Sequence, residues 1–178
     1  MPLALHPTID AIAATRAGDP AALAALYGAH GESVRRVAYR ILGDSDEAEE
    51  VVQDVFIGLP EALRHYREQG AFGPWLRTLA ARTALVRLRA THRRRKAPLS
   101  EASSVAVPPD ADRLAARLTL AAAIAKLPEA LRLVFVLKEM EGHSHAEVAA
   151  MLGIRTGTAE VRLHRAMRRL RALLEDRT

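Results

Sequence analysis

Hydrophobic residues recur at helical spacing along most of the chain. Between Ala48 and Leu59, apolar residues stand at positions 48, 51, 52, 55, 56 and 59, the pattern of a helix with one buried face. Similar patterns predict helices over residues 20–30, 32–42, 74–94, 112–126, 128–142, 145–152 and 156–174. Runs of β-branched residues are scarce, and Ala, Leu, Arg and Glu favour helix. The sequence therefore predicts an all-α protein.

Polar and small residues mark the ends of these helices. Asp and Ser side chains accept hydrogen bonds from free N–H groups at helix starts, and glycine readily adopts the left-handed conformation at helix ends. Asp44 followed by Glu47, and Ser144 followed by Glu147, have the spacing of a capping box. Pro60 is expected to kink or break the helix that begins after Asp44. The other predicted end residues are Asp19 before Pro20, Gly43 and Gly153.

The stretch from Lys96 to Asp112 interrupts the helical pattern. It reads KAPLSEASSVAVPPDAD and is rich in Pro, Ser and Ala. Such a composition is typical of a flexible tether, because it buries too little apolar surface to offset the entropy of ordering. The sequence thus predicts two small helical domains, residues 1–95 and 113–178, joined by a flexible linker over residues 96–112.

Composition excludes several classes of protein. The chain has no Cys, which rules out disulfides and thiolate metal sites, and no apolar run approaches the roughly 20 residues that span a bilayer. The N-terminal segment lacks the features of a signal peptide. No nucleophile–base pair or Gly-rich phosphate loop stands out, and the i, i+2 spacing of His143 and His145 does not put two metal ligands on one helix face. We therefore expect a cytoplasmic protein without membrane insertion, metal, cofactor or enzymatic activity.

Charge is segregated along the chain. Residues 1–63 have a net charge of −6, residues 64–96 of +9, residues 97–112 of −3 and residues 113–178 of +5. Such blocks indicate one surface for a basic partner and two surfaces for a polyanion. Solvated helix faces are the alternative explanation.

The segment SHAEVAAMLGIRTGTAEVRLHRAMRRL has the layout of a helix-turn-helix, with a tight turn at Gly153. Ala149 is small enough to let two helices cross closely, and Ile154 is expected to fill the turn. The apolar positions expected to face the core from the second helix are Val161, Leu163, Ala166 and Leu170. A recognition helix presents its N-terminal side chains to base edges, and the candidates here are Arg155, Thr156, Thr158, Glu160, Arg162 and Arg165. An ordinary amphipathic hairpin with a basic face is the alternative.

Acidic residues cluster where the helix after Asp44 begins. Acids in the first turn favour the helix dipole, which explains Asp46 and Glu47. Glu49, Glu50 and Asp54 stand beside the apolar stripe and either form a docking face for a basic protein surface or serve solubility.

The segment RTLAARTALVRLRATHRRRK, from Arg77 to Lys96, combines an apolar stripe with many cations. The stripe expected in the core is Leu79, Ala80, Thr83, Ala84, Val86 and Leu88. The groups left to face a phosphate backbone are Arg77, Arg82, Arg87, Arg89, His92, Arg93, Arg94, Arg95 and Lys96. Phe72 and Trp75 precede this helix and either stack on an extruded base or anchor the core, with His65 and Tyr66 further upstream.

These segments, in this order, resemble the extracytoplasmic-function (ECF) group of bacterial RNA polymerase sigma factors in the sigma-70 superfamily, over roughly residues 20–174. ILGDSDEAEEVVQDVF is similar to the family's segment that binds the clamp helices of the largest polymerase subunit. AFGPWLRTLAARTALVRLR resembles the segment that melts and reads the promoter −10 element. LPEALRLVFVLKEMEGHSHAEVAAMLGIRTGTAEVRLHRAMRRLRALL resembles the domain that binds the −35 element.

The resemblance implies core RNA polymerase (clamp helices and flap), promoter DNA and an anti-sigma factor as partners. The implied core-binding residues are Asp46, Glu47, Glu49, Glu50, Gln53 and Asp54. The implied −10 and DNA-backbone residues are His65, Tyr66, Arg77, Arg82, Thr83, Arg87, Arg89, His92, Arg93, Arg94 and Arg95.

The chain departs from the family pattern at several positions. The family commonly has Asn at Thr83, Asp at Val86 and Lys-Ser at Glu160-Val161, and Gly58 and Pro60 interrupt a helix that is often continuous. An acid at position 160 repels phosphates but accepts a hydrogen bond from cytosine N4, so the family's promoter preference does not carry over.

Two other functions are compatible with parts of the sequence. A helix-turn-helix repressor or activator with an N-terminal ligand or dimer domain accounts for the C-terminal half, but not for an acidic helix followed by a basic one. Such a protein binds duplex DNA alone, whereas a sigma factor requires core polymerase. An enzyme is the third class, and no catalytic constellation supports it.

Overall fold

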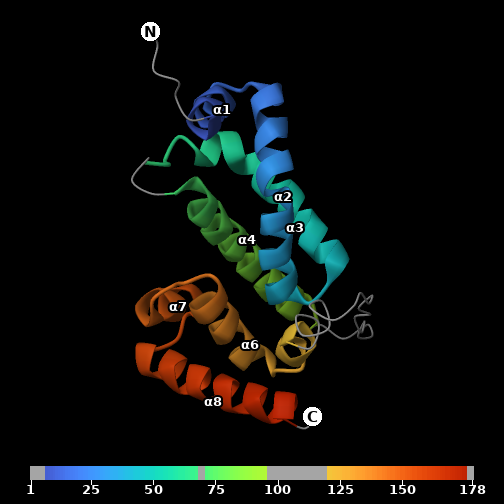
Figure 1. Cartoon of the computed structure of the whole chain (residues 1–178), viewed down its shortest axis with the longest axis vertical. Helices are drawn as coiled ribbons and strands as arrows, with labels where there is room; N and C mark the ends of the chain where they lie inside the picture. The colour runs from blue at the N-terminus through green and yellow to red at the C-terminus, as the bar shows by residue number, and fades with distance from the viewer. Residues whose placement is uncertain (1–6, 68–70, 96–119, 176–178) are drawn as a thin grey trace. The chain divides into compact units, whose positions relative to one another are not determined.

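The computed structural model describes residues 7–67, 71–95 and 120–175 (Figure 1). Each regular element in these ranges is a helix, which confirms the expected all-α class. The chain divides into two compact units, residues 1–84 and 85–178. The predicted linker over residues 96–112 lies outside the described residues, and the predicted domain boundary at residue 95 stays a prediction.

The first unit contains α1 (Pro7–Arg16), α2 (Pro20–Leu42), α3 (Ser45–Ala62) and the first half of α4 (Phe72–Arg95). α2 packs along α3, and α1 packs on both (Figure 1). The sequence pattern misses α1, because this Ala-rich helix has little hydrophobic periodicity and Ile12 is its buried anchor. The largest fully buried side chains of this unit are Val34, Val37, Ile41, Val51, Val52, Leu59, Leu63 and Leu76.

α2 is one helix where the sequence predicts two. The predicted break near Gly31 is wrong, because this glycine is buried within the helix and does not end it. The ring of Tyr27 lies 3.7 Å from the position that a Cβ at Gly31 would occupy. A methyl group at that position would be in ordinary van der Waals contact with the ring. The predicted ends of α2 are confirmed, since the Asp19 carboxylate accepts from the N–H of Ala21 at 2.8 Å and Gly43 has a φ of 75°.

α3 begins where the sequence predicts. The Asp44 carboxylate accepts hydrogen bonds from the N–H groups of Asp46 and Glu47, both at 2.9 Å. The helix continues through Pro60 and ends at Ala62, so the predicted break is wrong. Pro60 lies in the last turn, where the loss of one N–H donor interrupts little of the helix.

The second unit contains the end of α4, helical residues 120–125, α6 (Glu129–Phe135), the π-helix η1 (Val136–Met140), α7 (His145–Leu152) and α8 (Thr156–Glu175). The helix predicted over residues 128–142 is thus α6 continued by a π-helical turn. α8 packs on α6 and α7 around a core that includes Val134, Leu137, Val148 and Ala166 (Figure 1). Residues 112–119 of the predicted helix before α6 lie outside the described residues.

Candidate nucleic-acid interface

α7 and α8 form the predicted helix-turn-helix. Glu147 donates its backbone N–H to Ser144 Oγ at 3.2 Å, and Ser144 donates its N–H to Glu147 Oε2 at 2.7 Å, which confirms the capping box. Gly153 ends α7 in the left-handed conformation with a φ of 67°. The N–H of Ile154 then donates to the carbonyl of Ala149 at 3.0 Å. These bonds fix the direction in which the chain enters α8.

α8 has a buried side and an exposed side. Ala159, Ala166 and Leu170 are buried against the rest of the second unit. The exposed side, here called the α8 outer face, lines a shallow open hollow and consists of Glu160, Val161, His164, Arg165 and Arg168. Their helical spacing puts these side chains on one continuous surface.

Val161 is not a core residue. Its side chain is 51% exposed, so the expectation that it faces the core is wrong. Ala159, Ala166 and Leu170 define the buried stripe, and a residue two positions after Ala159 lies about 200° around a helix of 3.6 residues per turn. The sequence analysis misses His164 and Arg168, because it looks for base-reading residues near the N-terminal end of the recognition helix.

The six predicted base-reading residues differ in accessibility. Arg155, Thr156, Glu160 and Arg165 are exposed, whereas Thr158 and Arg162 are half-buried. Arg165 therefore belongs to the accessible surface, and Arg162 stands at its flank.

α4 presents a second exposed face with cations around a valine. Arg82, Val86, Arg89 and Arg93, here called the α4 basic face, are exposed and separated by four, three and four residues. Val86 is 60% exposed, so its predicted place in the core stripe is wrong. The buried stripe passes instead through Ala80, Ala81, Ala84 and Leu85.

The other predicted cations of α4 are less uniform. His92 and Arg94 are exposed, and Arg77, Thr83 and Arg87 are half-buried. The Thr83 hydroxyl donates to the carbonyl of Leu79 at 3.1 Å within its own helix. The side chain of Arg95, like Lys96, lies outside the described residues.

Two of these cationic candidates have partners in the second unit. Arg89 donates from its guanidinium to the carbonyl oxygen of Met151, and His92 Nε2 lies 3.0 Å from Glu129 Oε2. A phosphate contact at either residue would replace these interactions.

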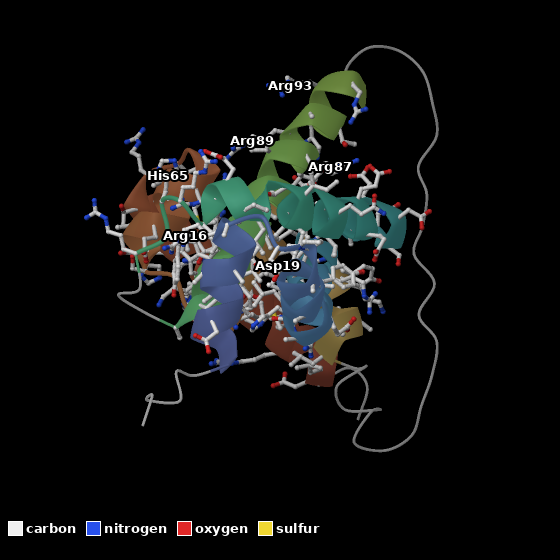
Figure 2. The ribbon with its side chains drawn as sticks, turned by 90° about the horizontal axis from the view of Figure 1, so that it is seen from above. Arg16, Asp19, His65, Arg87, Arg89 and Arg93 are labelled. Atoms are coloured by element: carbon white, nitrogen blue, oxygen red, sulfur yellow. The ribbon has the colours of Figure 1, made fainter. Side chains whose placement is uncertain are left out.

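Four rings gather at the start of α4. The ring centroids of Tyr66 and Trp75 are 4.7 Å apart, those of Tyr66 and Phe72 are 5.8 Å apart, and those of His30 and Phe72 are 5.1 Å apart. Such tilted and edge-on contacts are favourable between aromatic groups. Tyr66 is 8% exposed and supports the cluster from within, whereas His65 lies at the surface (Figure 2). Trp75 packs in the cluster and is half-buried, so both alternatives for this ring stay open.

His30 extends this cluster to α2. Burial, and secondly the positive charge of Arg77, lower the pKa of His30 below its ordinary value of 6.5. The cluster therefore holds a neutral imidazole near neutral pH.

The outer face of α3 is acidic but has an apolar centre. Glu50, Gln53 and Asp54 are exposed together with Ile57, which is 79% exposed. These residues stand at i, i+3, i+4 and i+7 and so share one surface, here called the α3 acidic face. Asp46 is also exposed, and Glu47 and Glu49 are half-buried.

A hollow beside the α3 acidic face is lined by both α2 and α3. Tyr27 is 47% exposed at its edge, and its ring stands edge-on to Phe56 at 5.0 Å between centroids. Glu49 and Val52 line the hollow from α3. Sequence reasoning misses Ile57 and Tyr27, although an isoleucine outside the apolar stripe of α3 is itself a signal.

The ranges 7–67, 71–95 and 120–175 contain no group of three His, Cys, Asp or Glu side chains arranged to hold a metal ion. No helix in the same ranges is long and apolar enough to cross a membrane.

Comparisons with known proteins identify the family. The Sigma-70 region 2 model matches residues 26–94 and the Sigma-70 region 4 model matches residues 117–170. SigM of Mycobacterium tuberculosis, an ECF RNA polymerase sigma factor, is 33% identical over 174 residues, which cover 95% of this chain and 86% of SigM. SigE of Mycolicibacterium smegmatis, also an ECF sigma factor, is 32% identical over 174 residues, 88% of this chain but 64% of SigE. The chain thus spans less than two thirds of the length of SigE.

Solved structures agree on the fold. RpoE from Bartonella quintana, in complex with the anti-sigma factor NepR, has a TM-score of 0.62 at 24% identity, over 82% of this chain and 91% of RpoE. CnrH, in complex with the cytosolic domain of CnrY, has a TM-score of 0.57 at 27% identity, over 97% of this chain and 100% of CnrH. On its two matched regions and its identity to SigM, the chain belongs to the ECF RNA polymerase sigma factors of the sigma-70 family, and its function is that of an alternative sigma factor in transcription initiation.

Proposed function

We propose that this sigma factor binds core RNA polymerase through α3, opens and reads the −10 element through α4, and reads the −35 element through α8. The observation that carries the proposal is the succession of three exposed surfaces of different chemistry. The α3 acidic face is followed by the α4 basic face and by the α8 outer face, and each belongs to a matched sigma region.

The α3 acidic face suits a basic helical surface of the polymerase. Protein interfaces commonly combine an apolar centre with a polar rim, and Ile57 surrounded by Glu50, Gln53 and Asp54 has this composition. Each exposed ion pair contributes about 0.2–1 kcal/mol, so the acids must act together and with the apolar centre. The clamp helices of the largest polymerase subunit are the proposed docking partner, and the flap is proposed to hold the second unit.

The α4 basic face suits the DNA backbone at the −10 element. Arg82, Arg89 and Arg93 lie along one side of a helix, where successive phosphates can be neutralised. His65 is exposed next to the aromatic cluster, close to where a base flipped out of the duplex would be held. A base must leave the stack before its Watson–Crick edge can be read, so melting and recognition occur on the same surface.

The α8 outer face suits the major groove of the −35 element. Arg165 is exposed on this face, and arginine donates two hydrogen bonds to a guanine edge. Glu160 has the complementary capacity to accept a hydrogen bond from cytosine N4.

We further propose that the chain is a binding subunit without catalytic activity of its own and that it acts in the cytoplasm. We also propose that an anti-sigma factor controls it. The anti-sigma proposal is supported by RpoE of Bartonella quintana, which was crystallised with the anti-sigma factor NepR.

Run-off transcription with purified core polymerase and a promoter library tests the proposal. We expect transcripts from a subset of promoters when the chain is added, and none from those promoters with core alone. Glu50→Lys combined with Asp54→Lys should abolish these transcripts while leaving the helical circular dichroism unchanged. If the chain bound duplex DNA tightly without core polymerase and directed no transcripts, it would act instead as a helix-turn-helix repressor.

A further inference from the structure

The α8 outer face has an apolar side chain at its centre. Val161 is 51% exposed and stands among Glu160, His164, Arg165 and Arg168 in the shallow hollow of that face. Isolated exposed apolar residues are ordinary on protein surfaces. Val161 differs because it lies on the recognition helix of a helix-turn-helix, one turn before Arg165, where side chains meet base edges.

The chemistry of valine limits what Val161 can recognise there. An isopropyl group neither donates nor accepts a hydrogen bond, so it cannot satisfy the polar edge of guanine, cytosine or adenine. In the major groove the C5-methyl group of thymine is the largest apolar group that a base pair presents. Contact between two apolar groups removes both from water, whereas a polar base edge facing Val161 would lose its hydration without compensation.

The neighbours of Val161 recognise other bases. Glu160 precedes it and accepts hydrogen bonds, and Arg165 follows one turn later and donates them. Val161 therefore adds a distinction that its charged neighbours cannot make, namely thymine against any base without the methyl group.

We propose that Val161 is a specificity-determining residue that selects thymine at one position of the −35 element by contact with its C5-methyl group. The inference rests on the proposed −35 role of α8 and names one base that this helix selects.

Substitution of thymine by deoxyuridine gives a direct test, because the two bases differ by that methyl group alone. The probe is a promoter fragment obtained by selection with the reconstituted holoenzyme, with the thymines of its −35 element replaced one at a time by deoxyuridine. We expect wild-type holoenzyme to lose about fourfold in affinity at one position, the value for one buried methyl group. Val161→Ala holoenzyme should bind the thymine and deoxyuridine probes equally at that position.

A matched variant separates this contact from a general loss of structure. Val161→Thr keeps one methyl group and the branched side chain, and it should retain part of the preference for thymine. Equal losses of affinity for wild type and Val161→Ala at every deoxyuridine position would overturn the proposal, as would a selected −35 element without thymine. In either case the holoenzyme would still recognise promoters, so the inference would fail while the proposed function stood. A holoenzyme that selected no promoter would instead overturn the proposed function.

Discussion

Arg16, the last residue of α1, donates from its Nε to the carbonyl oxygen of Leu63 at 3.1 Å, 47 residues further along the chain. Leu63 caps the end of α3, and the same carbonyl accepts the N–H of Tyr66 at 3.2 Å. The bond therefore ties the first helix to the turn that carries His65 and leads into the aromatic cluster (Figure 2). α1 lies before the matched sigma region, which begins at residue 26, yet it supports the surface proposed to hold the −10 base.

Replacing Arg16 should loosen this turn. Arg16→Ala removes one hydrogen bond between distant segments, which typically contributes about 1 kcal/mol to folding. We expect a loss of about that size in the free energy of unfolding of the first unit, measured by urea titration. Trp75, the one tryptophan of the chain, reports on this unit by fluorescence from within the aromatic cluster.

Arg64→Ala is the matched control for Arg16→Ala. Arg64 pairs with Glu61 at 3.1 Å on an exposed turn of the same region, and such surface pairs contribute little. Equal effects of the two variants would show that the Arg16 bond does not hold the turn.

The sequence predicts the caps well because they are local. Asp19, Asp44 and Ser144 accept hydrogen bonds from N–H groups two or three residues later, so the short motif contains the whole interaction. The acidic, basic and helix-turn-helix segments are equally visible, because their charge and periodicity lie within single helices.

Facts that depend on tertiary packing are not visible in the same way. Val86 and Val161 are apolar residues that the sequence pattern assigns to buried stripes, yet both are exposed. Gly31 resembles a helix end but is buried within α2, and the Arg16–Leu63 bond joins segments that no local pattern connects. These positions belong to the exposed faces and packed turns where the candidate sites lie. The sequence therefore predicts which helix carries each candidate site, but it does not predict which side chains of that helix are exposed.

A side chain at Gly153 should strain the turn of the helix-turn-helix. Its φ of 67° is left-handed, which costs roughly 1–2 kcal/mol for a residue with a Cβ, and no atom lies within 4 Å of the Cβ position to offset this strain. We expect Gly153→Ala to destabilise the second unit by about 1 kcal/mol. Hydrogen exchange of the α7 and α8 amides measures this change. Gly157→Ala, which places the same methyl group in open space within α8, should be neutral or slightly stabilising, and a loss as large as that at Gly153 would refute the backbone explanation.

The stability of the first unit should depend on the protonation of His30. Because burial and Arg77 lower the pKa of His30 in the folded chain, the unfolded chain takes up the proton first as the pH falls. The contribution of His30 to stability is therefore intact well above pH 6.5 and decreases as the pH falls below 6.5 toward the lower folded-state value. Urea titrations of wild type and His30→Gln at several pH values should show a steeper acid loss in the wild type. An acid loss in the wild type no steeper than that of His30→Gln would contradict this explanation.

Ile57 should contribute to core binding independently of salt. Burial of an isoleucine side chain stabilises an interface by about 1.5–3 kcal/mol, so Ile57→Ser should weaken binding to core polymerase about tenfold or more. The loss should be nearly the same at low and high ionic strength, whereas the effect of Glu50→Lys with Asp54→Lys should shrink as salt screens the charges. A fluorescence titration of each variant with core polymerase, without DNA and at low and high salt, measures both changes in affinity. Val161→Ser removes an exposed apolar group from α8 and should leave core binding unchanged. A normal affinity for Ile57→Ser would exclude the apolar centre from the docking face.

The α4 basic face and the α8 outer face should contribute to promoter binding in different ways. Arg93 lies on the α4 basic face and is proposed to neutralise a phosphate, a contact that is present on every sequence. Arg93→Ala in the holoenzyme should weaken binding evenly across −35 variants and lower the slope of log affinity against log salt by roughly one unit.

Arg165 lies on the α8 outer face and is proposed to donate to a base edge. Arg165→Ala should reduce the binding free energy of the holoenzyme by about 1–3 kcal/mol on the preferred −35 element. The reduction should be much smaller on an element already altered at the contacted base pair, because there the wild type has lost the contact too. Arg162→Ala should have the smaller effect, since the half-buried Arg162 stands at the flank of that face. Footprints of each holoenzyme on matched and altered promoters, over a range of salt concentrations, distinguish the two kinds of contact. An even loss for Arg165→Ala together with a changed −35 preference for Arg93→Ala would mean that the helix assigned to the backbone reads the bases.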